Sequence, residues 1–259
     1  MNNNVKNYFD LSNCSALIAG GATGLGYEMA KGLLSVGCDV TIIGRTKKRV
    51  LQSAISLNDM YDSACRGLVC DISNENSMLN MINEISSTNE DTLNIAINSA
   101  GCNVRNRIEN VTLDEWELIQ KVNLTGGFLF ARGVYPLLKN ANFGRLINVT
   151  SIFSKVSFPE RVSYASSKGG LLQLTKTLAI EWADSNITVN CISPGPFLTD
   201  INKPVLDNPE NYKIFCLNIP KGRFGNPEEI ITSCLFLASS NSSYVNGSEI
   251  VVDGGWISC

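Results

Sequence analysis

The sequence predicts an α/β fold, a single domain in which a parallel β-sheet of about seven strands is covered by helices on both faces. Three observations lead to this prediction. Short apolar, β-branched runs recur along the chain, longer stretches of helical period lie between them, and the two alternate nearly throughout. The apolar runs are near-continuous, as expected of parallel strands that are buried on both faces.

The elements follow from these patterns in chain order. The predicted strands lie at 16–19, 39–44, 67–70, 92–97, 145–150, 188–192 and 249–252. The predicted helices lie at 24–36, 47–57, 75–87, 113–139, 162–184 and 227–238, and the last begins with a proline and an acidic pair that suit a first helical turn. The chain shows no linker, low-complexity tract or repeat, so residues 1–259 are predicted to form one domain.

One segment breaks the alternation. Residues 194–225 contain several prolines and little period, and they follow the sixth predicted strand. A long loop inside a compact domain is usually functional, and open α/β sheets bind ligands at the carboxyl ends of their strands. The segment is therefore predicted to be a loop-like lid over a substrate cleft.

Composition excludes several classes of function. The chain has 21 basic and 24 acidic residues, a net charge of −3, which does not suit a protein whose main partner is nucleic acid or an anionic membrane. It contains no histidine, so Ser-His-Asp and Cys-His nucleophile systems and His-ligated metal sites are excluded. We expect no metal site, and any catalytic acid or base must be Tyr, Lys, Asp, Glu or Cys.

Cysteine usage indicates the compartment. Nine cysteines, an odd number without a CxxC pair, lie mostly in apolar runs, where a free thiol behaves as a small buried hydrophobe. The N-terminal residues 1–13 are polar, and no apolar run approaches the length of a membrane span. We expect a cytoplasmic protein with no membrane partner.

A glycine-rich loop follows the first predicted strand. Residues 20–26, with the sequence GGATGLG, lead directly into the first helix. Glycines there permit a tight turn and a close backbone approach to a pyrophosphate, whose charge the helix N-terminus stabilises. The position between first strand and first helix predicts a dinucleotide site.

The end of the second strand indicates which dinucleotide binds. An NAD site would offer a carboxylate there to the ribose 2′-hydroxyl, but Gly44 is followed by Arg45, with Lys47 and Lys48 close behind. A guanidinium binds phosphate in bidentate fashion, so NADP is favoured over NAD.

The spacing YxxxK occurs three times, as Tyr27-Lys31, Tyr135-Lys139 and Tyr164-Lys168. Each pair shares one helix face. Only the third begins a helix after a strand that ends in a hydroxyl pair, Thr150-Ser151, which a short loop would bring into the same cleft. The third pair is therefore the predicted reaction centre.

With these motifs in this order, the sequence resembles the short-chain dehydrogenase/reductase family over nearly its whole length. It looks nearest to the gluconate 5-dehydrogenase-like members. The loop at 19–26 is similar to the family's TGxxxGxG motif with Ala19 in place of Thr, and residues 98–101 are similar to its NNAG motif with Ser99 in place of the second Asn. These two departures are expected to remove bracing hydrogen bonds. The resemblance implies a Rossmann-type fold with cofactor contacts from Gly20, Thr23, Gly24, Leu25, Gly26, Arg45, Asp71, Asn98, Ala100, Gly101, Tyr164, Lys168, Pro194, Gly195 and Thr199.

The resemblance also implies four catalytic residues. Tyr164 would exchange a proton with the substrate oxygen, and Ser151 would donate a hydrogen bond to that oxygen. Because an unperturbed tyrosine has a pKa near 10, Lys168 and the oxidised nicotinamide are expected to lower the pKa of Tyr164 toward the working pH. Asn123 would hold a water that links Lys168 to solvent.

These residues predict an NADP(H)-dependent oxidoreductase that transfers a hydride between nicotinamide and a carbonyl or secondary alcohol. The predicted substrate is a small polar keto or hydroxy acid, with a cationic trio of Arg105, Lys155 and Arg161 to attract its carboxylate. The residues expected to line its pocket are Asn103, Arg105, Phe153, Phe158 and Phe197.

Two alternatives stay open, a 3-oxoacyl-(acyl-carrier-protein) reductase and, in another class, a non-catalytic dinucleotide-binding protein. By resemblance, a homotetramer is expected through the helices at 113–139 and 162–184 and through the last strand.

Overall fold

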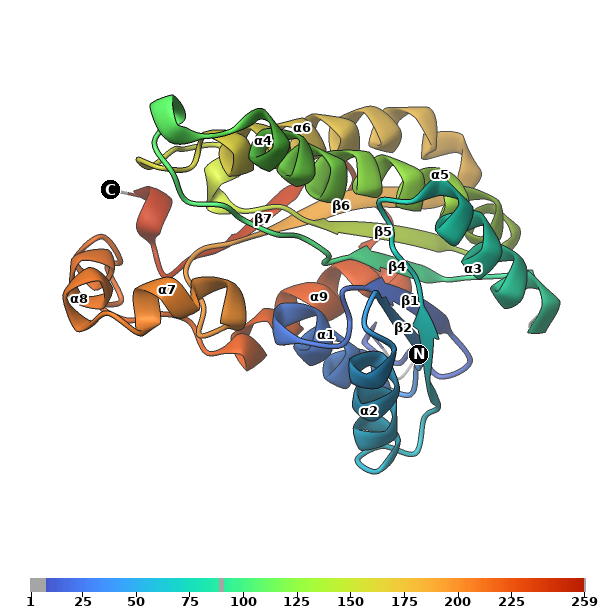
Figure 1. The fold of residues 1–259 in the computed structure, drawn as a ribbon. Helices are drawn as coiled ribbons and strands as arrows, with labels where there is room; N and C mark the ends of the chain where they lie inside the picture. The colour runs from blue at the N-terminus through green and yellow to red at the C-terminus, as the bar shows by residue number, and fades with distance from the viewer. Residues whose placement is uncertain (1–7, 89–90, 259) are drawn as a thin grey trace.

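The computed structural model describes residues 8–88 and 91–258, and a seven-stranded parallel sheet forms its centre (Figure 1). The strands are β1 (Ser15–Ala19), β2 (Asp39–Gly44), β3 (Cys65–Val69), β4 (Ile95–Asn98), β5 (Gly144–Val149), β6 (Ile187–Pro194) and β7 (Glu249–Val252). Their order in the sheet is β3-β2-β1-β4-β5-β6-β7. The predicted parallel α/β sheet is confirmed, with shifts at strand ends, the largest at the start of β4.

Helices cover both faces of the sheet, as Figure 1 shows. One face carries α1 (Gly24–Leu34), α2 (Lys47–Asn58) and α9 (Ile231–Ala238). The other carries α3 (Glu75–Thr88), α5 (Gly126–Asn140) and α6 (Val162–Glu181), with α4 (Leu113–Gln120) packed against α6. None of the described helices is long and apolar enough to cross a membrane.

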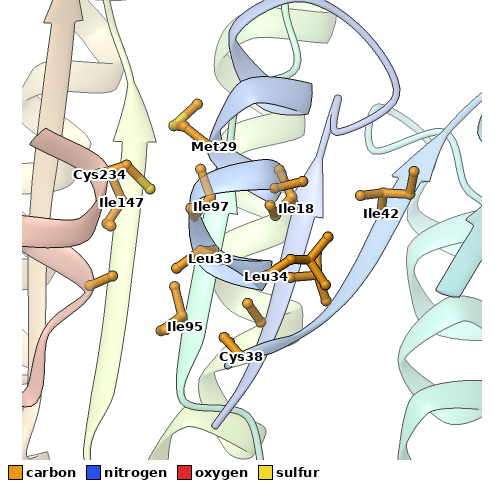
Figure 2. Close-up of a cluster of buried hydrophobic side chains, with 14 of the residues drawn as sticks. Ile18, Met29, Leu33, Leu34, Cys38, Ile42, Ile95, Ile97, Ile147 and Cys234 are labelled. Atoms are coloured by element: carbon orange, nitrogen blue, oxygen red, sulfur yellow. The ribbon is translucent and has the colours of Figure 1, made fainter. Parts of the chain in front are cut away.

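The core has two layers because successive strand residues point to opposite faces. Ile18, Ile42 and Ile97 pack toward Leu33 of α1, in the cluster that Figure 2 shows. Leu17, next to Ile18 in β1, packs in the second cluster with helices α3, α5 and α6. Burial on both faces explains why the strands read as continuous apolar runs.

The predicted helix 113–139 is one uninterrupted run of helical backbone, residues 113–140, with a π-helical turn inside it. Between α4 and α5 lies a π-helical turn, Lys121–Thr125, which contains the fully buried Asn123. The predicted helix is confirmed in its extent, but the apolar period, which runs through the whole helix, did not predict the wider turn, which accompanies side-chain contacts with residues distant in sequence. Such turns are frequent at functional sites.

The segment 194–225 is not the irregular loop that its sequence predicts. It contains α7 (Lys203–Leu206) and α8 (Pro209–Leu217). Asn208 caps α8 by accepting hydrogen bonds from the backbone N–H groups of Glu210 and Asn211. Both helices are too short to give a clear hydrophobic period, and their prolines occupy first turns, where proline is tolerated.

The strand order places a crevice at the carboxyl ends of β1 and β4. The chain builds β2 and β3 on one side of β1 and then crosses to β4 on the other. In open α/β sheets ligands bind at such a reversal. The loops after the two strands touch here, since a Cβ on Gly20 would lie 2.9 Å from the backbone nitrogen of Ala100.

Candidate active site

A cleft of about 390 Å³ opens at this crevice. Its wall is built from the segments that follow β1 to β6, together with the start of α6 and part of α8. Residues far apart in the sequence therefore meet at one edge of the sheet. Neither Tyr27 nor Tyr135, the first residues of the other two YxxxK pairs, belongs to this wall.

The glycine loop forms one end of the cleft, where Gly20, Thr23, Gly24 and Leu25 lie on the wall. Gly24 has a φ of +54°, a conformation that residues with a Cβ rarely adopt. Thr23 precedes α1 without a side-chain hydrogen bond to it, so that side chain does not satisfy the N–H groups of the first turn. This end offers backbone donors to an anion.

Two predicted cofactor contacts do not lie on the wall. Gly26 is packed beneath the loop, where an added Cβ would lie 2.3 Å from the carbonyl oxygen of Gly20. Asn98 is 1% exposed and donates a hydrogen bond from Nδ2 to Oδ1 of Asn148 at 3.3 Å, which ties β4 to β5. The structure therefore places both residues as supports of the site.

The bend after β2 and the first turn of α2 each present a guanidinium group to the cleft. Arg45 and Arg49 both lie on the wall, whereas the predicted neighbours Lys47 and Lys48 do not. Arg49 was missed by the sequence analysis; Arg45 lies in the bend after β2 and Arg49 in the first turn of α2, so no helical spacing links the two. Asp71 also lies on the wall, and its Oδ1 accepts hydrogen bonds from the backbone and side chain of Ser73 at 2.9 and 2.7 Å.

Three of the four predicted catalytic residues meet at the middle of the cleft. Ser151, Tyr164 and Lys168 all lie on its wall. Lys168 Nζ donates to the carbonyl oxygen of Val149 at 2.8 Å and lies 5.7 Å from the centre of the Tyr164 ring. The start of α6 is thereby fixed against the end of β5.

The fourth residue, Asn123, lies behind the wall. Its Oδ1 accepts from the backbone nitrogen of Cys102 at 2.9 Å, and its Nδ2 donates to the carbonyl oxygen of Cys102 and to Ser167 Oγ, both at 3.0 Å. A Cβ on Gly101 would lie 3.4 Å from Asn123 Oδ1 and 3.5 Å from Lys168 Nζ. The π-helical turn thus holds the loop after β4 against α6, next to the lysine.

Burial dominates the ionisation of the two central groups. It lowers the pKa of Lys168 to about 8. Burial also raises the pKa of Tyr164, against the lowering effects of the hydrogen bond from Ser151 and the charge of Arg161. The protein alone desolvates the phenol more than its neighbours stabilise the phenolate. The predicted lowering includes the charge of the oxidised nicotinamide, so it stays a prediction for the complex with the coenzyme.

A buried carboxylate that the sequence analysis missed supports the Ser151 loop. Glu249 of β7 hydrogen-bonds to Ser193 and Ser154 and forms an ion pair with Lys155 at 2.9 Å. Ser154 Oγ in turn lies 2.5 Å from the carbonyl oxygen of Ser151. Lys155, predicted to face the substrate, is therefore engaged with β7 and does not line the cleft.

At the substrate end, most of the predicted residues lie on the wall. They are Asn103, Arg105, Phe153 and Phe197, and the predicted cofactor contacts Ala100, Gly101, Pro194, Gly195 and Thr199 line the cleft as well. Phe158 does not, because its ring packs 5.3 Å from Phe215 and 6.1 Å from Trp256. Phe215 of α8 lines the cleft in its place.

The structure offers no alternative centre for metal or disulfide chemistry among the residues it describes. No group of three or more acidic or cysteine side chains within residues 8–88 and 91–258 could hold a metal ion. The eight cysteines in these ranges are free thiols, and five of them are buried.

Known proteins share this architecture. Residues 20–257 match the family model described as enoyl-(acyl carrier protein) reductase. A tropinone reductase homolog of Arabidopsis thaliana is 33% identical over 250 residues, 96% of this chain and 94% of the homolog. A 3-oxoacyl-(acyl-carrier-protein) reductase of Aquifex aeolicus is 33% identical over 241 residues, 93% of this chain and 96% of the relative.

A solved structure is similar throughout. The gluconate 5-dehydrogenase of Burkholderia cenocepacia, in complex with NADP and tartrate, superposes with a TM-score of 0.94 at 30% identity, covering 99% of this chain and 100% of that one. The likeness extends over the sheet, the cleft and the segment 194–225.

The lowered pKa of Lys168 predicts a pH dependence of stability. Between the folded value of about 8 and the ordinary value of 10.5, the unfolded chain binds more protons at this site than the folded one, so stability rises with pH. The test compares the wild type with Lys168→Met by urea denaturation under reducing conditions. We expect the free energy of unfolding of the wild type, relative to that of the variant, to increase by about 2 kcal/mol from pH 7 to 9.5.

Lys176→Met, on an exposed position of the same helix, is the matched control. A difference between wild type and Lys168→Met that is constant over this pH range would contradict the predicted direction.

Proposed function

This chain belongs to the short-chain dehydrogenase/reductase family of NAD(P)-dependent oxidoreductases, and from that premise we propose that it transfers a hydride between NADP(H) and a carbonyl or secondary alcohol. The observation that carries the proposal is the placement of Ser151, Tyr164 and Lys168 on one cleft wall, with Lys168 Nζ 5.7 Å from the centre of the Tyr164 ring. A non-catalytic dinucleotide-binding protein would have no need of this set.

The residues at the glycine-loop end fit a dinucleotide. Gly20 has room for no side chain against Ala100, and Gly24 takes a positive φ at the start of α1, so the backbone can approach a pyrophosphate closely. Arg45 and Arg49 supply the positive charge that a 2′-phosphate requires, which is why we propose NADP rather than NAD. When bound, the coenzyme supplies or accepts the hydride.

The chain's own residues manage the proton. Tyr164 donates its phenolic proton to the substrate oxygen during reduction, and Ser151 donates a hydrogen bond to the same oxygen. Lys168, held by the carbonyl of Val149, stabilises the phenolate that results. Asn123 acts as a positioning residue that fixes the loop after β4 beside Lys168.

For the substrate we propose a small polar keto or hydroxy acid. The three relatives described above, at 30–33% identity, carry three different substrate names, so similarity does not choose among them. The cleft wall favours the acid because Arg105 and Arg161 lie on it. Asn103 Oδ1 is buried there with no hydrogen-bond partner in the described part of the chain, and a hydroxyl of a polar substrate would suit it.

A 3-oxoacyl-(acyl-carrier-protein) reductase is the second candidate, on the likeness to the Aquifex aeolicus enzyme. Turnover of 5-ketogluconate-like acids compared with that of an acetoacetyl thioester separates the two. Faster turnover of the thioester would reject the acid.

We also propose that residues 1–259 form a single domain, that 194–225 acts as its lid, and that the protein is cytoplasmic. The lid proposal is supported by Phe197, Thr199 and Phe215, which reach the cleft from this segment. The free thiols of the described cysteines support a reducing compartment.

The proposed role of Tyr164 as proton donor can be tested by removing its hydroxyl. Tyr164→Phe removes the transferable proton but keeps the ring, so kcat is expected to fall by at least about 100-fold. Binding of NADPH, measured by its fluorescence, is expected to stay within about twofold because the phenol is not its main contact. Tyr135→Phe, in a YxxxK pair outside the cleft, is the matched control. Retained turnover in Tyr164→Phe would reject the mechanism.

The proposed contacts of Arg45 and Arg49 with the 2′-phosphate can be tested by comparing NADP with NAD binding. Arg45→Ala and Arg49→Ala are each expected to weaken NADP binding roughly 10- to 100-fold and NAD binding by much less, because each loses charge-assisted hydrogen bonds to the 2′-phosphate. Lys48→Ala, on the same helix but off the cleft, should leave both affinities unchanged. If both variants weakened NADP and NAD binding equally, the assignment of NADP would be rejected.

We propose a homotetramer built on α4, α5, α6 and the edge strand β7. Leu118, Phe128 and Ile180 expose large apolar side chains on these helices, and all four residues of β7 are half-buried at the sheet edge. Light scattering at micromolar concentration should give four times the chain mass of 28.1 kDa. A monomeric mass would contradict the assembly.

A further inference from the structure

The charge on the cleft wall differs in sign from the charge of the chain. The chain carries a net charge of −3. Two carboxylates, Asp71 and Asp200, lie on the wall against five basic side chains, which are Arg45, Arg49, Arg105, Arg161 and Lys168. The cleft is therefore suited to anionic ligands.

Four of the five basic side chains already have a partner or a proposed ligand. Arg45 and Arg49 stand at the nucleotide end, and Lys168 donates to Val149. Arg105, which the sequence analysis placed against the substrate, donates from Nη2 to the carbonyl oxygen of Ile201 and to Asn202 Oδ1, both at 3.1 Å. Arg105 thus ties the loop after β4 to the lid.

Arg161 is the remaining one, and its side chain is deeply buried. The residue is 4% exposed, yet it lies on the cleft wall. Its Nη1 donates to the carbonyl oxygen of the adjacent Glu160 at 2.9 Å, and its guanidinium lies 6.0 Å from the ring centre of Phe153. In the described part of the chain it forms no ion pair with a carboxylate, and its Nε and Nη2 have no protein acceptor.

Such a placement is unfavourable for a cation that has only a backbone carbonyl as partner. A buried cation without a counter-ion loses its hydration without compensation. Burial and then the charge of Arg105 lower the pKa of Arg161 to about 10. The chain also adopts a strained conformation next to it, since Glu160 has a φ of +65°. Unfavourable features of this kind persist where a ligand compensates for them.

We propose that Arg161 binds the carboxylate of the substrate, with Arg105 serving as a latch that holds the lid across it. The planar guanidinium matches a carboxylate in bidentate geometry. Arg161 directly precedes α6, Tyr164 lies in the first turn of that helix, and both line the cleft, so one small molecule can reach both side chains. That the bound carboxylate belongs to the substrate rests on the proposed function, whereas the binding of a carboxylate by Arg161 does not.

Calorimetric titration tests the site without turnover. The probes are D-gluconate, L-tartrate and acetoacetate, each beside its neutral amide, titrated with and without saturating NADP. At least one carboxylate is expected to bind the wild type more tightly than its amide. Arg161→Gln should weaken that carboxylate at least tenfold and leave the amide within twofold, with Arg161→Lys between them. Arg107→Gln, exposed and paired with Glu109, is the control.

Three results would overturn the assignment. They are the absence of carboxylate binding by the wild type, an unchanged affinity in Arg161→Gln, and tighter binding of inorganic phosphate than of any carboxylate, which would indicate a phosphorylated ligand. If Arg161 binds carboxylates and turnover is absent, the proposed reaction fails while the site stands. If neutral ketones are reduced and carboxylates do not bind, the site fails while the reaction stands.

A second measurement separates a binding role from a structural one. Removing an unpaired buried charge should stabilise the ligand-free protein, so Arg161→Met is expected to raise the thermal midpoint by about 2–4 °C. A guanidinium that served only to hold the fold would give a lower midpoint in the variant, which would contradict the proposal.

Discussion

The contact between the loop after β1 and the loop after β4 is the constraint on which the rest of the site depends. A Cβ on Gly20 would lie 2.9 Å from the backbone of Ala100, so the two strand ends meet with no side chain between them. From this contact the chain continues to α1 on one face of the sheet and to α5 on the other. The cleft lies where the two connections separate, and the ends of β2, β5 and β6 extend its wall on either side.

Desolvation sets the electrostatics of this cleft. It lowers the pKa of Lys168 to about 8 and that of Arg161 to about 10, and it raises the pKa of Tyr164. An anion, or a negative charge that develops on a ligand, would stabilise the cationic forms of Lys168 and Arg161, which desolvation disfavours. In a chain with a net charge of −3, the cleft at this edge carries five basic side chains and two carboxylates, so its local charge is positive.

Supports behind the wall fix these groups more firmly than the wall itself. Asn123, in a π-helical turn, binds Cys102 and Ser167 and so joins the loop after β4 to α6. Glu249, from the edge strand, holds Ser193 and Ser154 on either side of the Ser151 loop. Sequence patterns gave Asn123 only through family resemblance and gave no sign of Glu249, because a lone carboxylate in an apolar strand has no spacing that announces its partners.

The sequence by itself determined the alternation of strands and helices, the glycine loop, and the placement of Ser151 after a strand and of Tyr164 and Lys168 in the first two turns of a helix, since local periodicity and spacing encode all of these. Only the tertiary structure decided that Arg49 rather than Lys48 faces the cleft, that Phe215 replaces Phe158 on its wall, that Lys155 pairs with β7, and that the lid contains helices. The physical reason is that each of these depends on which distant surface a side chain meets. Burial and pairing depend on contacts between segments that are distant in the chain, and the sequence of one segment does not show which other segment it will contact.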